Sequence, residues 1–271
     1  MGERTVVRDI VTKEMLIKAF RSMGVSTNAV IEVHASLSSF GFVIGGARTV
    51  VDALLETVGE GGTIMMPVQT TDNSEPSRWQ APPAMPELWK DIRREMPAYE
   101  PETSDLREMG AIAGNFCHRP GIVFSSHPAL SYAALGRYAK LLCNRQSLHF
   151  PLGEESPAAR LYELKGNVLL LGVGFDKCTC MHLAEYRAEA RPIEVDGAST
   201  RTAGDGREWK KYLNLELKAE DFENVRAAMI KKSMIRTATL SGCEMQYFPA
   251  AGAIDEAVRY FQKTAIYDLY R

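Results

Sequence analysis

The sequence predicts an α/β protein, a three-layer α/β/α fold around a central mixed, partly parallel sheet, with a small C-terminal β-rich part. A buried strand at 29–35, a serine- and glycine-rich loop, a helix at 47–58 and a second strand at 62–68 follow one another. This order is typical of a parallel strand pair joined by a helix. An apolar run at 168–173 indicates a further strand buried on both faces. With no internal repeat and no low-complexity linker, residues 1–271 are expected to form a single domain.

Apolar periodicity and turn residues predict the other elements of the first half. They are helices at 12–23, 87–95, 107–118 and 132–143 and a short strand at 122–125. The polar segment at 69–86, which contains several prolines and a tryptophan, separates two of these elements. Structureless segments of this length are uncommon in compact proteins unless they have a function, so we expect a functional loop.

The second half begins with a well-marked helix, because Ser156 is a good N-cap and Pro157 suits the first helical position. A β-hairpin is expected at 193–217, turning at the Gly-Asp-Gly sequence at 204–206. The remaining expected elements are helices at 157–164, 179–190, 221–232 and 251–263 and strands at 235–239 and 245–248.

Composition excludes several classes of protein. The formal net charge is only -2, which argues against a general nucleic-acid binder. No apolar run approaches the roughly 18 residues needed to span a membrane. Residues 1–9 are charged and contain no apolar signal core, so we expect a cytoplasmic protein. The five cysteines form no disulfide framework, which suits a reducing compartment. The sequence does not determine whether the protein forms a homo-oligomer.

The most informative segment is 166–187, where the apolar strand ends at a glycine-rich turn containing Asp176. A helix expected to open near Thr179 carries His182 and Glu185, which share one helix face because they are three residues apart. Ligands in open α/β sheets bind beyond the carboxyl ends of the strands. We therefore expect this imidazole and carboxylate to take part in chemistry.

Cys178, Cys180 and His182 alternate in a spacing that suggests zinc. However, residues two apart point in different directions on a helix, and no second ligand pair follows, so we expect no metal. A cysteine nucleophile activated by His182 is a further alternative, with poor helical geometry for that hydrogen bond.

Two other segments are candidates for ligand binding. Serines and glycines at 34–46 could present backbone N–H groups to a phosphate or pyrophosphate, although neither a dinucleotide fingerprint nor a P-loop is present. A tight strand-to-helix crossover would explain the same composition. His127, which follows the strand at 122–125, could position a ligand or satisfy carbonyl groups in the core, and by itself the second interpretation is favoured.

Six motifs occur in an order that resembles the aminoglycoside 3-N-acetyltransferase family, antibiotic acetyltransferases unrelated in fold to the GNAT enzymes. They are His-Ala-Ser-Leu-Ser-Ser-Phe-Gly at 34–41, Gly-Gly-Thr-Ile-Met-Met-Pro at 61–67, Met-Gly-Ala at 109–111, Ser-His-Pro-Ala-Leu-Ser at 126–131, Ser-Pro at 156–157, and Leu-Gly-Val-Gly at 171–174 with Thr-Cys-Met-His-Leu-Ala-Glu at 179–185. An ordered set is far more specific than any single motif.

The resemblance implies an N-acetyltransferase that uses acetyl-CoA as co-substrate and acetylates an aminoglycoside on the 3-amino group of its 2-deoxystreptamine ring. It implies cofactor-binding residues, namely Ser36, Leu37, Ser38, Gly41, Phe42, Val43, Gly110 and Ser126. It places Gln69, Asp72 and His127 near the amine substrate and makes His182 the catalytic histidine.

The chemistry of amine acetylation explains why a histidine is needed. An ammonium group has no lone pair, so a base must remove a proton before or during attack on the thioester, and an imidazole with an unperturbed pKa of about 6.5 suits this task. Glu185 and Asp176 are the nearest carboxylates in sequence that could orient the ring, and Glu216 or Asp221 remains open. We expect direct transfer without an acetylated enzyme.

The chain departs from the family at two places, which puts the acceptor in doubt. Cys178 stands where the family commonly has asparagine, and Phe124 or Ser125 where it often has arginine. Acetylation of another amine is therefore an alternative. A CoA-binding module without catalysis is a third hypothesis, which the presence of both His182 and Glu185 disfavours.

Overall fold

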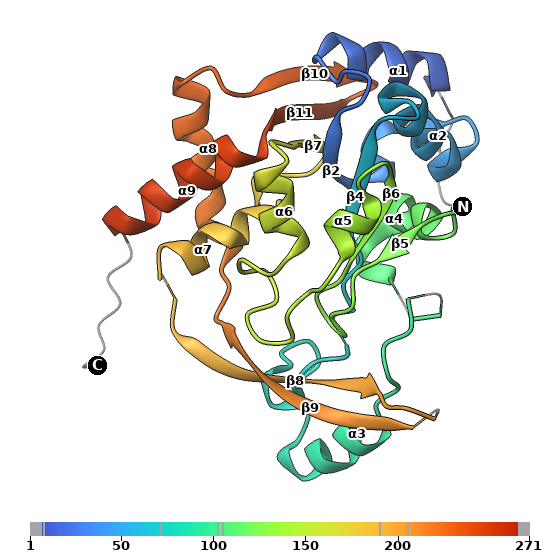
Figure 1. Cartoon of the computed structure of the whole chain (residues 1–271). Helices are drawn as coiled ribbons and strands as arrows, with labels where there is room; N and C mark the ends of the chain where they lie inside the picture. Colours follow the sequence, from blue (N-terminus) through green and yellow to red (C-terminus); the bar gives the residue numbers. More distant parts are fainter. Residues whose placement is uncertain are drawn as a thin grey trace, which may run out of the picture.

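A mixed sheet of seven strands lies at the centre of the part of the chain that the computed structural model describes, residues 7, 9–70, 72–101, 103–104, 106–189, 191–204 and 206–264 (Figure 1). The expected N-terminal segment, for the most part, and Asp205 of the expected hairpin turn lie outside these residues. In spatial order the strands are β10 (Arg236–Leu240), β11 (Cys243–Pro249), β7 (Asn167–Leu171), β2 (Val30–Ala35), β4 (Thr63–Pro67), β6 (Tyr132–Gly136) and β5 (Val123–Phe124).

The parallel part of the sheet is its centre. β2 runs parallel to both of its neighbours, β4 and β7, whereas the outer pairings are antiparallel. The expected parallel pair of strands near the N-terminus is therefore confirmed, and the two C-terminal strands extend the same sheet. Because β2, β4 and β7 run in one direction, their carboxyl ends meet at one edge of the sheet.

Helices cover both faces of this sheet, which confirms the three-layer prediction (Figure 1). One face packs against α1 (Lys13–Ser22), α2 (Gly46–Val58) and α4 (Gly110–Cys117), and the other against α5 (Ala139–Cys143), α6 (Pro157–Glu163), α7 (Leu183–Arg187), α8 (Phe222–Lys231) and α9 (Ala250–Thr264). Leu169 and Leu171 point into the first layer, and Val168 and Leu170 into the second. This alternation explains why the strand is apolar throughout. Among the described helices, none is long and apolar enough to cross a membrane.

A two-stranded ribbon lies apart from the central sheet, at the lower edge of Figure 1 next to α3 (Trp89–Glu95). It consists of β8 (Ile193–Arg201) and β9 (Arg207–Leu215), which form the expected hairpin. The polar loop at 69–86 is attached to it through Asn73, whose side chain accepts from Ser199 N at 2.8 Å and donates to Ser199 O at 3.1 Å. The loop is thus held by hydrogen bonds that imitate strand pairing.

The predicted helix at 132–143 is wrong. Residues Tyr132–Gly136 form β6, which pairs with β4 so that Ala133 lies opposite Met66, and only Ala139–Cys143 are helical. Gly136 has a φ of +123°, and a Cβ there would lie 2.1 Å from Gly62 O, so only glycine fits where the strand ends. Pairing with β4 overrides the helical tendency of this alanine- and leucine-containing sequence.

The expected helix at 179–190 is also shorter than predicted. Its first turn is the 3₁₀ helix η6 (Thr179–His182), and the α-helix α7 ends at Arg187. A second small difference is that β1 (Ile10–Val11) pairs in parallel with β3 (Phe42–Val43), an interaction between segments too short to predict.

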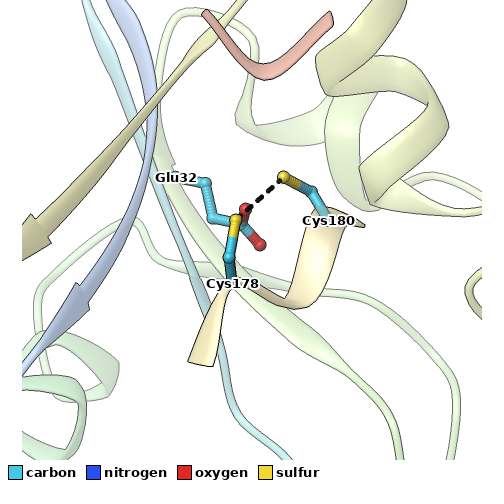
Figure 2. Close-up of side chains that lie close together, drawn as sticks. All are labelled: Glu32, Cys178 and Cys180. Atoms are coloured by element: carbon cyan, nitrogen blue, oxygen red, sulfur yellow. Dashed lines mark hydrogen bonds between the residues drawn. The ribbon is translucent and has the colours of Figure 1, made fainter. Parts of the chain in front are cut away.

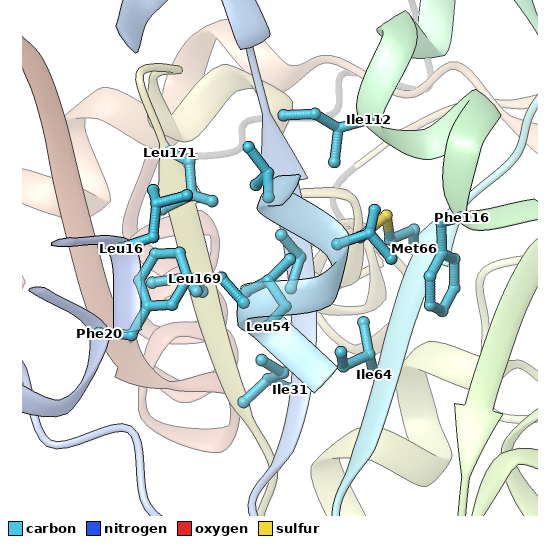
Figure 3. Close-up of a cluster of buried hydrophobic side chains, with 14 of the residues drawn as sticks. Leu16, Phe20, Ile31, Leu54, Ile64, Met66, Ile112, Phe116, Leu169 and Leu171 are labelled. Carbon is cyan, nitrogen blue, oxygen red and sulfur yellow. The ribbon is translucent and has the colours of Figure 1, made fainter. Parts of the chain in front are cut away.

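The layer between α1, α2 and α4 and the sheet contains the buried side chains shown in Figure 3. Leu169 of β7 is completely buried there, so truncating it leaves a cavity. We expect Leu169→Ala to lower the free energy of unfolding by about 3 kcal/mol, within the range of such substitutions. The control Leu88→Ala truncates a side chain that is 51% exposed and should change the free energy of unfolding by less than about 0.5 kcal/mol. Urea denaturation measures both, and equal effects would contradict this packing.

Candidate active site

A cavity of about 550 Å³ opens where the carboxyl ends of β2, β4 and β7 meet. After β2 the chain crosses one face of the sheet through α2 and then forms β4, next to β2. β7 lies on the other side of β2 and is preceded by α6, which packs on the opposite face. Such a change of direction opens a crevice between the loops, which is where ligands bind in open α/β sheets. The lining combines residues after all three strands with the first turn of α4.

His182 lines this cavity and is held by Glu185. Its Nδ1 lies 2.5 Å from Glu185 Oε2, a contact made possible because η6 ends at His182 and α7 begins directly afterwards. If Nδ1 carries the proton that it donates to the carboxylate, Nε2 is the ring nitrogen with a lone pair. The ring also packs against Phe222, with centroids 5.0 Å apart.

Glu185 is fully buried, and both of its oxygens have partners. Oε1 accepts hydrogen bonds from Arg191 Nε at 2.6 Å and from Lys218 N at 3.1 Å, while Oε2 faces His182. Arg191 in turn donates to Asp221 Oδ2 at 2.7 Å. Burial opposes the charge of Arg191, but its hydrogen bonds to Asp221 and Glu185 raise its pKa overall. Asp221, Arg191, Glu185 and His182 therefore form a continuous series of contacts, and His182 is its member on the cavity.

Among the four carboxylates considered from the sequence, Glu185 is the one in contact with His182. Asp176 lines the cavity but pairs with Lys177 Nζ at 2.9 Å. Asp221 reaches His182 only through Arg191 and Glu185, and Glu216 pairs with Lys218 Nζ at 3.0 Å. No sequence motif surrounds Arg191, so its contact with Glu185 could not be predicted from the sequence.

The loop after β2 brings Ser36, Leu37 and Ser38 to the cavity wall. Ser36 N donates to Leu171 O at 2.9 Å, which ties the loop to the end of β7, and the hydroxyl groups of Ser36 and Ser38 lie 3.1 Å apart. Gly110, at the start of α4, lies beside this loop, since a Cβ there would be 3.8 Å from Ala35 O, and its φ is +81°. The positive end of this helix and two hydroxyl groups thus face one cavity, an arrangement that favours anions.

Gln69 also lines the cavity, but the remaining predicted site residues lie elsewhere. They are Gly41, Phe42, Val43, Asp72, Ser126 and His127. Phe42 and Val43 form β3, against β1. Asp72 borders a second cavity, of about 710 Å³, together with Tyr99. Ser126 is exposed on the surface.

His127 is buried within a hydrogen-bonded turn. Its Nδ1 accepts from Ala129 N at 3.1 Å and from Leu130 N at 2.9 Å, and its Nε2 lies 3.3 Å from Leu148 O. The ring meets Tyr212 edge to face at 4.9 Å. Both ring nitrogens are therefore engaged with the backbone, which is the core arrangement that the sequence alone favoured over ligand binding.

Cys180 is not positioned as a nucleophile. Its thiol is completely buried in the layer of α5–α9, and burial raises its pKa well above the usual value. A buried, protonated thiol is unreactive, so this geometry disfavours the thiol-dependent alternative.

Comparison with known proteins agrees with this architecture. The model of the aminoglycoside 3-N-acetyltransferase family matches residues 33–262. The chain belongs to this family. The family resemblance inferred from the six motifs is thereby confirmed.

Relatives in the family match the chain over nearly its whole length. The SPbeta prophage-derived aminoglycoside N(3')-acetyltransferase-like protein YokD of Bacillus subtilis (strain 168) is 38% identical over 92% of each chain. Its crystal structure superposes with a TM-score of 0.91, covering 95% of this chain and 96% of that one. Aminoglycoside N(3)-acetyltransferase VIII of Streptomyces fradiae is 31% identical over 93% of this chain and 92% of its own. The structure of AAC-IIIb in a binary complex with CoASH, 26% identical, gives a TM-score of 0.83 and covers 94% of this chain and 97% of its own. The family's acetyltransferase fold thus extends over nearly all of the chain.

The buried His127 should make the stability of the protein depend on pH. Burial lowers the pKa of His127 to about 4, although the hydrogen bond to Leu148 opposes the shift. The unfolded chain, with a histidine pKa of about 6.5, then binds the proton more tightly. Stability is therefore complete above about pH 6.5 and declines as the pH falls toward 4, by about 2 kcal/mol between pH 7 and pH 5.

Urea denaturation of the wild type and His127→Gln at pH 7 and pH 5 measures this contribution. The variant should be less stable at pH 7 but should lose about 2 kcal/mol less on acidification. His149→Gln, at an exposed histidine, serves as the control and should follow the wild type. An unchanged pH dependence in His127→Gln would contradict the assignment.

Proposed function

We propose that this chain is an acetyl-CoA-dependent N-acetyltransferase that acetylates the 3-amino group of the 2-deoxystreptamine ring of an aminoglycoside by direct transfer, with His182 as the general base. The observation that carries the proposal is the His182–Glu185 pair at a cavity formed by the family's motifs. Family membership supports the reaction, and the CoASH complex of AAC-IIIb supports the donor. A cytoplasmic location remains part of the proposal.

The proton path follows from the hydrogen bonds of His182. The substrate ammonium first loses one proton to solvent. With Nδ1–H directed at Glu185, Nε2 can then take the second proton as the neutral amine attacks the thioester carbon. The C–S bond then breaks, and the imidazolium can return its proton to the departing CoA thiolate. Glu185 orients the ring and stabilises its charged form, while Arg191 and Lys218 N hold the carboxylate in place.

The part of the cavity wall formed by the loop after β2 and the start of α4 suits the donor. Ser36, Leu37, Ser38 and Gly110 border the cavity, where hydroxyl groups and the start of α4 favour the pyrophosphate of CoA. Four other residues expected to bind the cofactor lie outside the cavity. Their roles remain predictions, and they would require that CoA extend beyond the cavity to reach them. They are Gly41, Phe42, Val43 and Ser126.

Other lining residues suit a cationic amine as the acceptor. Glu108 and Asp176 place two carboxylates on the cavity, Lys177 adds one ammonium group that pairs with Asp176, and Gln69 adds an amide. Aminoglycosides carry several ammonium groups, which such a lining attracts. Asp72 and His127 lie off this cavity, however, and this supports the second candidate, acetylation of a different amine.

Replacing His182 tests the general base. We expect His182→Asn to lower kcat by about 10²- to 10⁴-fold with little change in the KM for acetyl-CoA, since proton removal contributes a factor of this size. Release of CoA in the presence of several aminoglycosides provides the assay, and His149→Asn, at an exposed histidine, should retain wild-type rates.

Full activity of His182→Asn would refute the proposed base. An acetylated cysteine detected by mass spectrometry in the first turnover would refute direct transfer. Binding of CoA without acetylation of any amine would favour the non-catalytic module instead.

Replacing Glu185 tests the orientation of the ring. In Glu185→Gln the amide can donate to Nδ1 and so leave the proton on Nε2, the tautomer that cannot act as a base. We expect kcat to fall by about 10²-fold or more, with the KM for the amine nearly unchanged. The matched control is Glu154→Gln, whose carboxylate pairs with Arg187 at the surface. A larger KM with unchanged kcat would show that Glu185 serves substrate binding instead.

A further inference from the structure

Three potential metal ligands meet beside the candidate active site. Glu32 lies in the middle of β2, and its carboxylate faces the thiol groups of Cys178 and Cys180, as Figure 2 shows. The three side chains are completely buried, and one ligand atom from each lies within 4.8 Å of the others. Glu32 and Cys178 lie outside the six family motifs, whereas Cys180 lies within the motif at 179–185.

Glu32 lacks the partners that a buried carboxyl group requires. Neither of its oxygens has a hydrogen-bond partner among the described residues. His34 Nε2 lies 3.4 Å from Oε1, which makes an ion pair only if the ring is protonated, and the same nitrogen accepts a hydrogen bond from Thr179 N at 3.3 Å. A buried polar group without partners costs folding free energy, and a charged group costs more. The site therefore calls for a compensating group.

The positions of the two sulfur atoms match a tetrahedral zinc ion. With Zn–S bonds of about 2.3 Å, two thiolates at the tetrahedral angle are about 3.8 Å apart. Cys178 Sγ and Cys180 Sγ are 3.7 Å apart. Thiolates together with a carboxylate form a donor set that zinc accepts.

The backbone explains how side chains two residues apart converge. Cys178 has a ψ of 86°, outside the helical region, and Cys180 follows in the 3₁₀ helix η6. The argument from sequence that these side chains point apart assumed a regular helix at this point. It also lacked Glu32, which lies 146 positions before Cys178 and is brought there by the pairing of β2 with β7.

We propose that Glu32, Cys178 and Cys180 bind one structural Zn²⁺ ion. Tyr132 Oη is a further buried polar atom that has no hydrogen-bond partner within the described part of the chain. Binding would release the two thiol protons to solvent. The proposal replaces the expectation of no metal.

Such an ion would connect β2 to the turn that carries the general base. Cys180 precedes His182 by two residues, and Thr179 between the cysteines lines the cavity. The ion itself would be enclosed behind the cavity wall, because Cys178 and Cys180 are fully buried. Its role is to hold this turn in place, and no step of acetyl transfer passes through it.

The test is to measure the metal content of the full chain, without a histidine tag, purified in reducing buffer with zinc present and then dialysed. We expect about one zinc per chain in the wild type by mass spectrometry of the elements, and a loss of most of it in Cys180→Ser. Cys117→Ser, which removes a buried thiol on the other face of the sheet, is the matched control and should keep its zinc. Metal-free protein titrated with Co²⁺ should show thiolate-to-cobalt charge-transfer absorption, absent in Cys180→Ser.

Glu32→Gln keeps the shape of the side chain and provides a variant that should remain folded. If zinc is bound, this substitution should weaken zinc affinity by about 10-fold or more and reduce the rise in Tm on adding zinc. The proposal is overturned if wild type binds neither Zn²⁺ nor Co²⁺, if Cys180→Ser retains the same zinc content, or if the intact mass is lighter by two thiol hydrogens, as in a Cys178–Cys180 disulfide.

Discussion

The parallel pairing of β2 with strands on both of its edges is the constraint on which the rest of the structure depends. It leaves the strand fully enclosed, so its side chains must suit two helical layers at once. Ile31 and Val33 do so on one face by apolar packing. On the other face the strand carries Glu32 and His34, and polar groups in such a position require specific partners. The same pairing brings three carboxyl ends together and so creates the cavity.

Two buried glutamates show how differently this requirement can be met. Glu185 has a histidine, an arginine and a backbone N–H around its two oxygens, and Arg191 is itself paired with Asp221. Such a network compensates the cost of removing a carboxylate from water. Glu32 is equally buried, but its oxygens have no hydrogen-bond partner among the described residues. Burial by itself therefore says little about function, whereas the set of partners distinguishes Glu185, which we propose orients a base, from Glu32, which we propose binds a metal ion.

The predictions succeeded where the local pattern and the tertiary structure agree. The strand around 168–173 and the helix beginning after Ser156 depend on apolar runs and capping residues that are close together in the chain. The segment at 132–143 has a sequence compatible with a helix, yet half of it becomes β6 because the edge of β4 is available for pairing. Likewise, the cluster of Glu32 with the two cysteines joins residues that no short pattern connects.

The sequence by itself determined the layers of the fold and the family, because these depend on periodicity and ordered motifs, and it made Glu185 one of four candidate carboxylates for His182. Only the tertiary structure decided which carboxylate contacts His182 and which predicted residues line the cavity, with Gln69 on it and Asp72 and His127 away from it. The physical reason is that helical periodicity and capping act within a few residues. Contacts between Arg191 and Glu185, or between Glu32 and Cys178, depend on strand pairing and layer packing across the whole chain.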